Sequence, residues 1–149
     1  PFTGDYAGVL LYQTLYVFGF SNQPTSSHIK DGLKLKNCRI TNAVKCLPPE
    51  NKPLGEEVRR CNAYLAEELR GLPKGAVVLA LGGIAHGAVL RALGLKPKAY
   101  PFGHGHEFPL PGGGWLVTSY HCSRYNTQTR RLTAPMFRDV FAQVRRRLV

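Results

Sequence analysis

The sequence predicts an α/β fold, a three-layer sandwich in which helices flank a mostly parallel central sheet. Stretches with apolar residues at helical spacing alternate along the chain with short, continuous apolar runs, which are typical of buried strands. The run at residues 76–81 passes through Gly82 and Gly83 directly into a helical pattern, which makes a β–α unit. With 149 residues and no repeat or long linker, the chain suits a single domain spanning residues 1–149.

The first half of the chain predicts a helix, a loop, a strand and a second helix. Residues 6–20 carry apolar side chains at helical spacing, and a polar loop follows over residues 21–34. Over residues 38–44 the even-numbered side chains alternate with the odd-numbered ones in the two-residue period of a strand. The next helix ends at Gly71. Its apolar face comprises Val58, Cys61, Leu65 and Leu69.

The second half continues the alternation. The run at residues 76–81 is the second strand, and the helix after it carries three apolar residues: Ile84, Val89 and Leu93. A loop rich in Gly, Pro and His spans residues 101–114, and Trp115 to Ser119 form another buried strand. Thr133 can cap a final helix. The apolar face of that helix comprises Phe137, Val140, Val144 and Leu148.

Three polar or small residues fall where the predicted strands end. Asn42 lies at the end of the first strand, whereas Gly82 and His121 follow the second and third. In a sheet of this type the sites gather at the carboxyl ends of the strands. We therefore expect these three residues to share one pocket.

The charge of the chain indicates a polyanionic partner. The 20 Lys and Arg residues outnumber the 9 Asp and Glu residues and leave a formal net charge of +11. This favours nucleic acid, although an anionic membrane surface would attract the same charge. Because no run approaches the roughly 20 apolar residues of a membrane-spanning helix and no signal-peptide pattern is present, we expect a soluble, cytoplasmic monomer without a membrane partner.

Three strings of residues resemble the motifs of family 4 and family 5 (type B) uracil-DNA glycosylases, and they occur in the same order. The first is Pro1-Phe2-Thr3-Gly4-Asp5. The second starts at Thr41 and reads Thr-Asn-Ala-Val-Lys-Cys-Leu-Pro-Pro-Glu-Asn-Lys-Pro, and the third starts at His121 and reads His-Cys-Ser-Arg-Tyr-Asn-Thr-Gln-Thr. The His-Cys-Ser-Arg of the third string resembles family 5, because family 4 has His-Pro-Ser there.

The resemblance implies a hydrolase, a monofunctional DNA glycosylase with the three-layer α/β fold. It would release uracil, and other damaged bases such as hypoxanthine, from DNA and leave an abasic site in base-excision repair. The family's N-terminal portion, with a Gly-Leu-Ala-Pro segment and two cysteines, is expected upstream of Pro1. A family 4 enzyme and a non-catalytic DNA-binding relative are the alternatives.

The resemblance assigns three residues to binding of the base. An enzyme that extrudes a base must hold it against an aromatic face and read its polar edge. Phe2 takes the place of the family's uracil-stacking residue, with Gly4 in the same substrate-binding string. The amide of Asn42 both donates and accepts, which matches the edge of uracil. On the residues alone, Phe2 also fits a core position and Asn42 a turn.

Asp5 and His121 are the catalytic candidates. Cleavage of the glycosidic bond needs a carboxylate near the cationic sugar and the attacking water, and a group that stabilises the departing uracil anion. The resemblance supports Asp5 in the first role, because family 5 lacks the catalytic polar residue that other uracil-DNA glycosylases carry upstream. Asp5 also fits the N-cap of the following helix, and the two roles are compatible.

The string after His121 is expected to contact DNA. By analogy with the insertion loop of related enzymes, it would grip the backbone and fill the gap that the base leaves. The DNA-binding candidates are Ser123, Arg124, Asn126 and Arg130. A solvated surface turn is the alternative. Gly82 and Gly83 could present N–H groups to a phosphate, and close packing of strand and helix explains them equally well.

Cys46 and Cys61 are the metal-binding candidates. As a bare pair they fit buried free thiols as well. The resemblance implies that they ligate a [4Fe–4S] cluster, completed by two further cysteines upstream of this chain. Two other cysteines do not match ligand positions: Cys38 and Cys122. His104 and His106 lack a convergent third ligand and are interpreted as polar loop residues.

Overall fold

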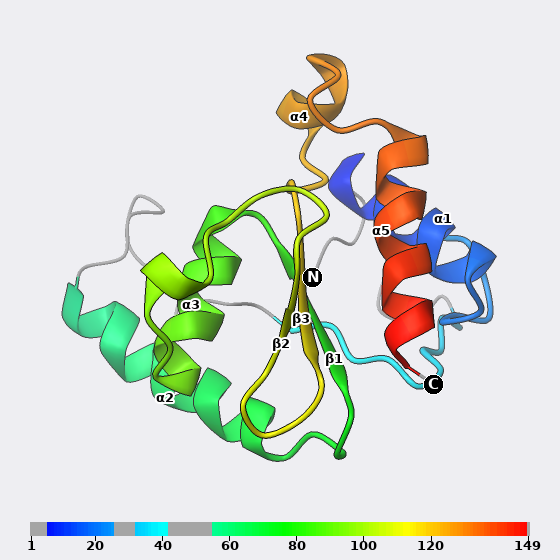
Figure 1. Cartoon of the computed structure of the whole chain (residues 1–149). Coiled ribbons are helices and arrows are strands. Elements are labelled where there is room, and N and C mark those ends of the chain that lie inside the picture. Colours follow the sequence, from blue (N-terminus) through cyan, green and yellow to red (C-terminus); the bar gives the residue numbers. More distant parts are fainter. Residues whose placement is uncertain (1–5, 26–31, 42–54, 149) are drawn as a thin grey trace.

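The computed structural model describes residues 6–25, 32–41 and 55–148, with side chains for these ranges except residues 6, 7 and 55–61. Figure 1 shows the elements that these residues form. Several predicted site residues lie outside the described residues: Phe2, Gly4, Asp5, Asn42 and Cys46.

A small mixed sheet forms the centre of the molecule, with its strands in the order β1, β3, β2. β1 (Val77–Leu81) runs parallel to β3 (Trp115–Ser119), and both coincide with the predicted apolar runs. β2 (Glu107–Pro109) runs antiparallel to β3 and lies inside the segment predicted as a loop over residues 101–114. The described sheet therefore combines one parallel and one antiparallel pairing.

The turn between β2 and β3 depends on glycine. Gly113 and Gly114 have φ angles of 97° and 82°, a region that strains residues with a side chain. The N–H of Leu110 donates to the carbonyl of Gly114 at 3.0 Å and closes the turn. A Cβ on Gly114 would lie 2.3 Å from the carbonyl oxygen of Ala76, so the close approach of the two chains also excludes a side chain.

Helices cover both faces of the sheet, which confirms the three-layer α/β arrangement (Figure 1). α2 (Gly55–Arg70) and α3 (Gly83–Leu93) pack together on one face, and α1 (Tyr6–Val17) and α5 (Ala134–Arg147) lie on the other. Each side has its own buried cluster. The first includes Leu65, Val89, Leu90 and Leu116, and the second includes Leu11, Leu15, Val117 and Phe137. Among the described residues no helix has the length and apolar character needed to cross a membrane.

α1 ends at Val17, before the end predicted from its pattern, because Gly19 reverses the chain with a φ of 79°. The N–H of Phe20 donates to the carbonyl of Leu15 at 2.8 Å, and that of Gly19 donates to Tyr16 at 3.1 Å. These paired bonds are a Schellman motif. Phe20 and Leu15 are both buried, so the core covers the turn.

Residues 38–41 differ from the prediction of a strand, because they alternate in burial without forming one. The partly buried positions are Cys38 and Ile40, and the exposed ones are Arg39 and Thr41. Asn37 has a left-handed φ of 52°, which interrupts the extended backbone just before this segment. The isolated bridge in this region pairs Leu35 with Ser21. The alternating pattern therefore predicted correctly which side chains are partly buried. It did not show that this segment lacks a neighbouring strand to pair with among the described residues.

α5 begins and packs as its sequence predicts. The hydroxyl of Thr133 accepts a hydrogen bond from the N–H of Met136 at 3.3 Å and caps the helix. The buried residues of the helix are Phe137, Val140, Phe141 and Val144. Full burial of each such side chain stabilises the fold by about 1.5–3 kcal/mol.

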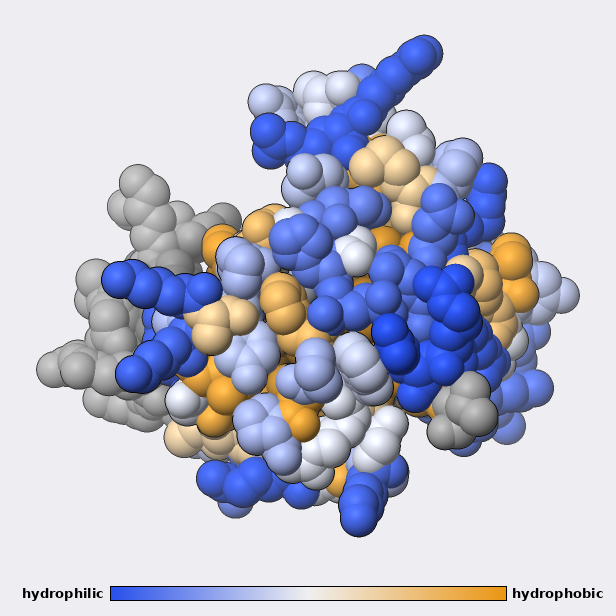
Figure 2. Space-filling view, in the orientation of Figure 1, coloured by the Kyte–Doolittle hydropathy of each residue, from blue (hydrophilic) through white to orange (hydrophobic). Residues whose placement is uncertain are grey.

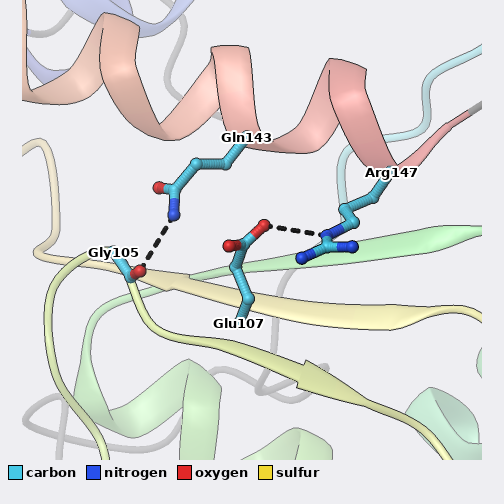
Figure 3. A network of polar contacts seen from close by, with 4 residues as sticks. All are labelled: Gly105, Glu107, Gln143 and Arg147. Atoms are coloured by element: carbon cyan, nitrogen blue, oxygen red, sulfur yellow. Dashed lines mark hydrogen bonds and ion pairs between the residues drawn. The ribbon is translucent and has the colours of Figure 1, made fainter.

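Two polar contacts fix α5 along the sheet (Figure 3). Gln143 Nε2 donates to the carbonyl of Gly105 at 3.0 Å, and Arg147 Nε lies 3.1 Å from Glu107 Oε1. The guanidinium of Arg147 also covers the ring of Trp115, 3.7 Å from its centroid. The helix is thereby tied to β2, to β3 and to the loop that precedes β2.

Candidate functional site

The carboxyl ends of β1 and β3 bring Gly82 and His121 together. The N–H of Gly82 donates to the carbonyl of Ser119 at 2.8 Å, which extends the parallel pairing by one residue. A Cβ built on Gly82 would lie 3.3 Å from the Cβ of His121. The structure therefore confirms that Gly82 and His121 lie together at the carboxyl edge of the sheet. Asn42, the third residue predicted at this edge, lies outside the described residues.

The string after His121 folds as a short helix, α4 (Arg124–Gln128), where the sequence predicted a loop. Ser123 caps this helix, because its hydroxyl accepts the N–H of Asn126 at 3.3 Å. The side-chain Nδ2 of Asn126 in turn donates to the carbonyl of His121 at 2.9 Å. The polar side chains of the string thus hold their own loop in shape and fix the backbone of His121.

A basic tip projects from this edge; it comprises Arg124, Tyr125, Arg130 and Arg131. Figure 2 shows the hydrophilic surface over α4 standing away from the body of the molecule. Tyr125 is 72% exposed, and both Arg124 and Arg130 are exposed. The guanidinium of Arg131 lies over the ring of Tyr120, 5.7 Å from its centroid. The tip therefore offers several cations and one aromatic ring beside His121.

His104 also lies at this edge, a position that the sequence pattern did not predict. Its Nδ1 accepts the N–H of Tyr120 at 3.1 Å, and the two rings are 4.9 Å apart at 30°. Burial lowers the pKa of His104, and a backbone hydrogen bond to Met136 and the charge of Asp139 oppose that shift. His106, two residues on, bonds the carbonyl of Pro101 instead. A Gly-His-Gly-His string carries no signal that separates these two roles.

The predicted metal ligands cannot be paired in the described structure, because Cys46 lies outside it and only the backbone of Cys61, on α2, is described. Over the ranges described, no three His, Cys, Asp or Glu side chains gather as a metal site. Cys38 is a free thiol. Burial raises the pKa of the Cys38 thiol. Cys122, which follows His121 in the sequence, is fully buried.

A cavity of about 410 Å³ lies at the opposite end of the strands. Its walls include Arg70, Lys74, Ala76 and Leu110. None of the candidate catalytic, substrate-binding, DNA-binding or metal-binding residues lines it. The candidate residue His121 therefore lies at the carboxyl edge and not at this cavity.

The chain is similar to known uracil-DNA glycosylases over nearly its whole length. The family model described as "Uracil DNA glycosylase superfamily" matches residues 1–145. A type-5 uracil-DNA glycosylase of Thermus thermophilus is 48% identical over 146 residues, which cover 98% of this chain and 66% of that protein. One from Pyrobaculum aerophilum is 42% identical over 139 residues, 93% of this chain and 60% of that protein.

A type-4 uracil-DNA glycosylase of Pyrobaculum aerophilum is 39% identical over 68 residues, 45% of this chain and 34% of that protein. The type-5 matches are thus the more extensive, and the chain spans less than two thirds of the length of either type-5 relative. From the match over residues 1–145 and an α/β fold of the expected kind, the chain belongs to the uracil DNA glycosylase superfamily and is similar to type-5 members over nearly its whole length.

Proposed function

We propose that this chain carries the base-excising site of a DNA glycosylase that hydrolyses the bond between uracil and its deoxyribose and leaves an abasic site. The observation that carries the proposal is the placement of His121. It is partly buried at the end of β3, in contact distance of Gly82, and it stands at the base of the exposed basic tip. The type-5 relatives, which are uracil-DNA glycosylases by name, support the same reaction.

In this proposal the base leaves the stack and is held by the strings that the resemblance assigns to substrate binding. The ring of Phe2 stacks on uracil, Gly4 leaves room for it, and the amide of Asn42 pairs with its polar edge. A base that offers no hydrogen-bond partner to Asn42 would leave its amide unpaired once the base covers it, and an unpaired buried amide costs about 1–3 kcal/mol. Selectivity for uracil thus rests on Asn42.

Bond cleavage then proceeds with two catalytic residues. The pair of electrons in the glycosidic bond moves to the base, and His121 stabilises the negative charge that develops on the uracil oxygen. The carboxylate of Asp5 stabilises the cationic sugar and takes a proton from the water that attacks it. No amine nucleophile is needed, so the DNA strand stays intact.

The basic tip holds the DNA in this proposal. Arg124 and Arg130 are exposed and contact phosphates, which gives affinity without sequence preference. Ser123 and Asn126 belong to the same DNA-binding string. Because one bond from each is made inside the loop, we expect them to act on DNA mainly by keeping the tip in shape.

We further propose that Cys46 and Cys61 hold one side of a [4Fe–4S] cluster, with the two upstream cysteines that the resemblance implies. Thiolates are the usual ligands of such clusters. Bound there, the cluster would link α2 to the segment that carries Asn42 and would add no group to bond cleavage.

Single-turnover release of uracil from a duplex tests the proposed function. Wild-type protein in excess should release the base from a uracil duplex and not from a matched thymine duplex. His121→Ala should lower the release rate by about 10²–10³-fold, because its contact strengthens only as charge develops, with duplex affinity close to wild type. Binding without release by wild-type protein would favour the non-catalytic DNA-binding alternative.

A duplex with hypoxanthine in the uracil position addresses substrate range. We propose that it is also cleaved, as the resemblance to family 5 implies. Release of uracil alone would favour the selectivity expected of a family 4 enzyme.

A further inference from the structure

β3 leads to His121. Just beyond the end of this strand, the backbone N–H of Tyr120 needs a hydrogen-bond acceptor from outside the sheet. β1 pairs with β3 as far as Ser119, and β2 pairs with β3 only as far as Val117. Past β2 the chain still follows β3, because the N–H of Gly105 donates to Thr118 at 2.8 Å and that of Thr118 donates to His106 at 3.0 Å. The next N–H on that side belongs to Tyr120, where the backbone ladder has ended.

The side chain of His104 takes over at this position. Its Nδ1 lies 3.1 Å from the backbone nitrogen of Tyr120 and 3.5 Å from the hydroxyl of Ser119. An amide N–H can only donate, so Nδ1 must be the unprotonated acceptor nitrogen. A neutral imidazole carries one proton, so that proton lies on Nε2. The backbone of Met136 raises the pKa of His104 and so acts against the effect of burial.

The loop around His104 is itself held from two sides. Thr118 Oγ1 donates to the carbonyl of Gly103, and Gln143 on α5 donates to Gly105 at 3.0 Å (Figure 3). Tyr120 stacks on the His104 ring, with Arg131 over the same phenol. The ring thus joins three parts of the fold: the loop before β2, the end of β3 and the start of α5.

Resting on the proposed function, we propose that His104 is a positioning residue for base excision: neutral and protonated on Nε2, it fixes the backbone of Tyr120 and thereby the place of the adjacent His121. The carbonyl of His121 is held by Asn126 and its flank by Gly82. His104 supplies a further constraint, on the N-terminal side. A catalytic group needs such constraints, since a displacement of about 1 Å can lower a rate about 10²-fold.

Protonation of His104 would remove this constraint, because Nδ1–H and the Tyr120 N–H would then face each other as two donors. The charged and titratable groups around the ring are the Asp139 carboxylate on α5, the Tyr120 phenol at the end of β3, and Arg131 over that phenol. Burial lowers the pKa of His104 from its ordinary 6.5. The contact therefore stays intact above pH 6.5 and is lost as the pH falls through the lowered value.

Three substitutions separate the acceptor at Nδ1 from the rest of the ring. His104→Ala removes it and should lower single-turnover release of uracil by about 10- to 100-fold, with duplex affinity within about twofold. His104→Asn places an amide oxygen near the position of Nδ1 and should restore most of the rate, while His104→Gln, whose amide lies one bond farther out, should not. His106→Ala is the matched control and should release uracil at the wild-type rate.

The pH profile adds a readout that a purely structural role would not move. The Asn side chain at position 104 does not titrate, so the acid limb of the profile should lie at lower pH for His104→Asn than for wild type. Unchanged release by His104→Ala, equal losses in the Ala and Asn variants, or superimposable profiles would each overturn the inference.

Hydrogen exchange tests the contact apart from catalysis. The amide of Tyr120 should exchange faster in His104→Ala than in wild type, and the Asn variant should restore its protection. This measurement decides the matter even if His104→Ala folds poorly, because the Asn variant keeps the acceptor. It also separates the two proposals: wild-type protein that releases no uracil refutes the proposed function, whereas wild-type exchange at Tyr120 in His104→Ala refutes the role of His104.

Discussion

Gly82 shows how a single residue can serve strand pairing and site geometry at once. Its backbone has φ 94° and ψ 163°, a region that only glycine adopts without strain. Its N–H bonds Ser119, and a Cβ would press on His121 at 3.3 Å. Gly83 next to it has no heavy atom within 4 Å of a built Cβ. The two neighbours therefore differ completely in their tolerance of a side chain.

We expect Gly82→Ala to lower the free energy of unfolding by about 1–3 kcal/mol and to slow uracil release by displacing His121. Gly83→Ala is the control and should change the free energy of unfolding by less than about 0.5 kcal/mol. Denaturant unfolding and single-turnover release measure the two effects. Equal behaviour of the two variants would show that the contact with His121 has no consequence.

The sequence could predict the glycine pair but not the reason for it. Phosphate binding and close packing both explained Gly82 and Gly83, because the φ angle and the neighbour of a residue depend on strands that meet only in the fold. Ile84 shows the same limit. It is one of the three apolar residues predicted on this helix, yet it is 77% exposed, whereas Val89 is buried. The two lie five positions apart and therefore about 140° apart around the helix.

Among the elements, helices were predicted better than strands. The pattern of α2, α3 and α5 is contained in each segment, so the spacing of apolar residues located them, and Thr133 was correctly predicted as the cap of α5. A strand also needs a partner, which explains why residues 38–41 alternate without a ladder and why β2 was missed. β2 has only three residues, too few for a period to show. Asn42, Asp5 and Phe2 stay predictions, because they lie outside the described residues.

The element that carries Cys61 allows a test of the proposed cluster. Full-length protein should contain iron and show the visible absorbance of thiolate-to-iron charge transfer. Cys61→Ser should lose both signals, because it removes a ligand on α2. Cys38→Ser is the matched control. Because Cys38 is a free thiol, this substitution should leave the iron content and the visible absorbance unchanged. Iron-free wild-type protein, or equal iron in both variants, would contradict the proposal.

At the scale of the whole molecule, charge governs the proposed encounter with DNA. The net charge of +11 attracts any duplex, whereas the exposed tip concentrates cations beside His121. Affinity should therefore fall steeply with salt, since each phosphate contact releases a counterion. The base-excising step should be far less sensitive to salt, because it occurs in a partly buried site.

Arg124→Ala should weaken binding and reduce the salt slope, in log affinity against log salt, by about 1. Arg70→Ala is the control: it removes the same charge at the opposite end of the strands, beside the cavity, and should leave the slope nearly unchanged. Titrations of a fluorescent duplex at several salt concentrations measure both. Equal slopes for the two variants would remove the tip from the DNA interface.

The brevity of β2 has a consequence for how copies of this chain behave in a crowded solution. A strand at the end of a sheet invites pairing with another molecule, and short strands, prolines and charged side chains prevent it. β2 combines all three, since it has three residues, ends in Pro109 and carries Glu107, whose carboxylate Arg147 engages. On this side the described sheet therefore resists edge-to-edge pairing between copies of this chain.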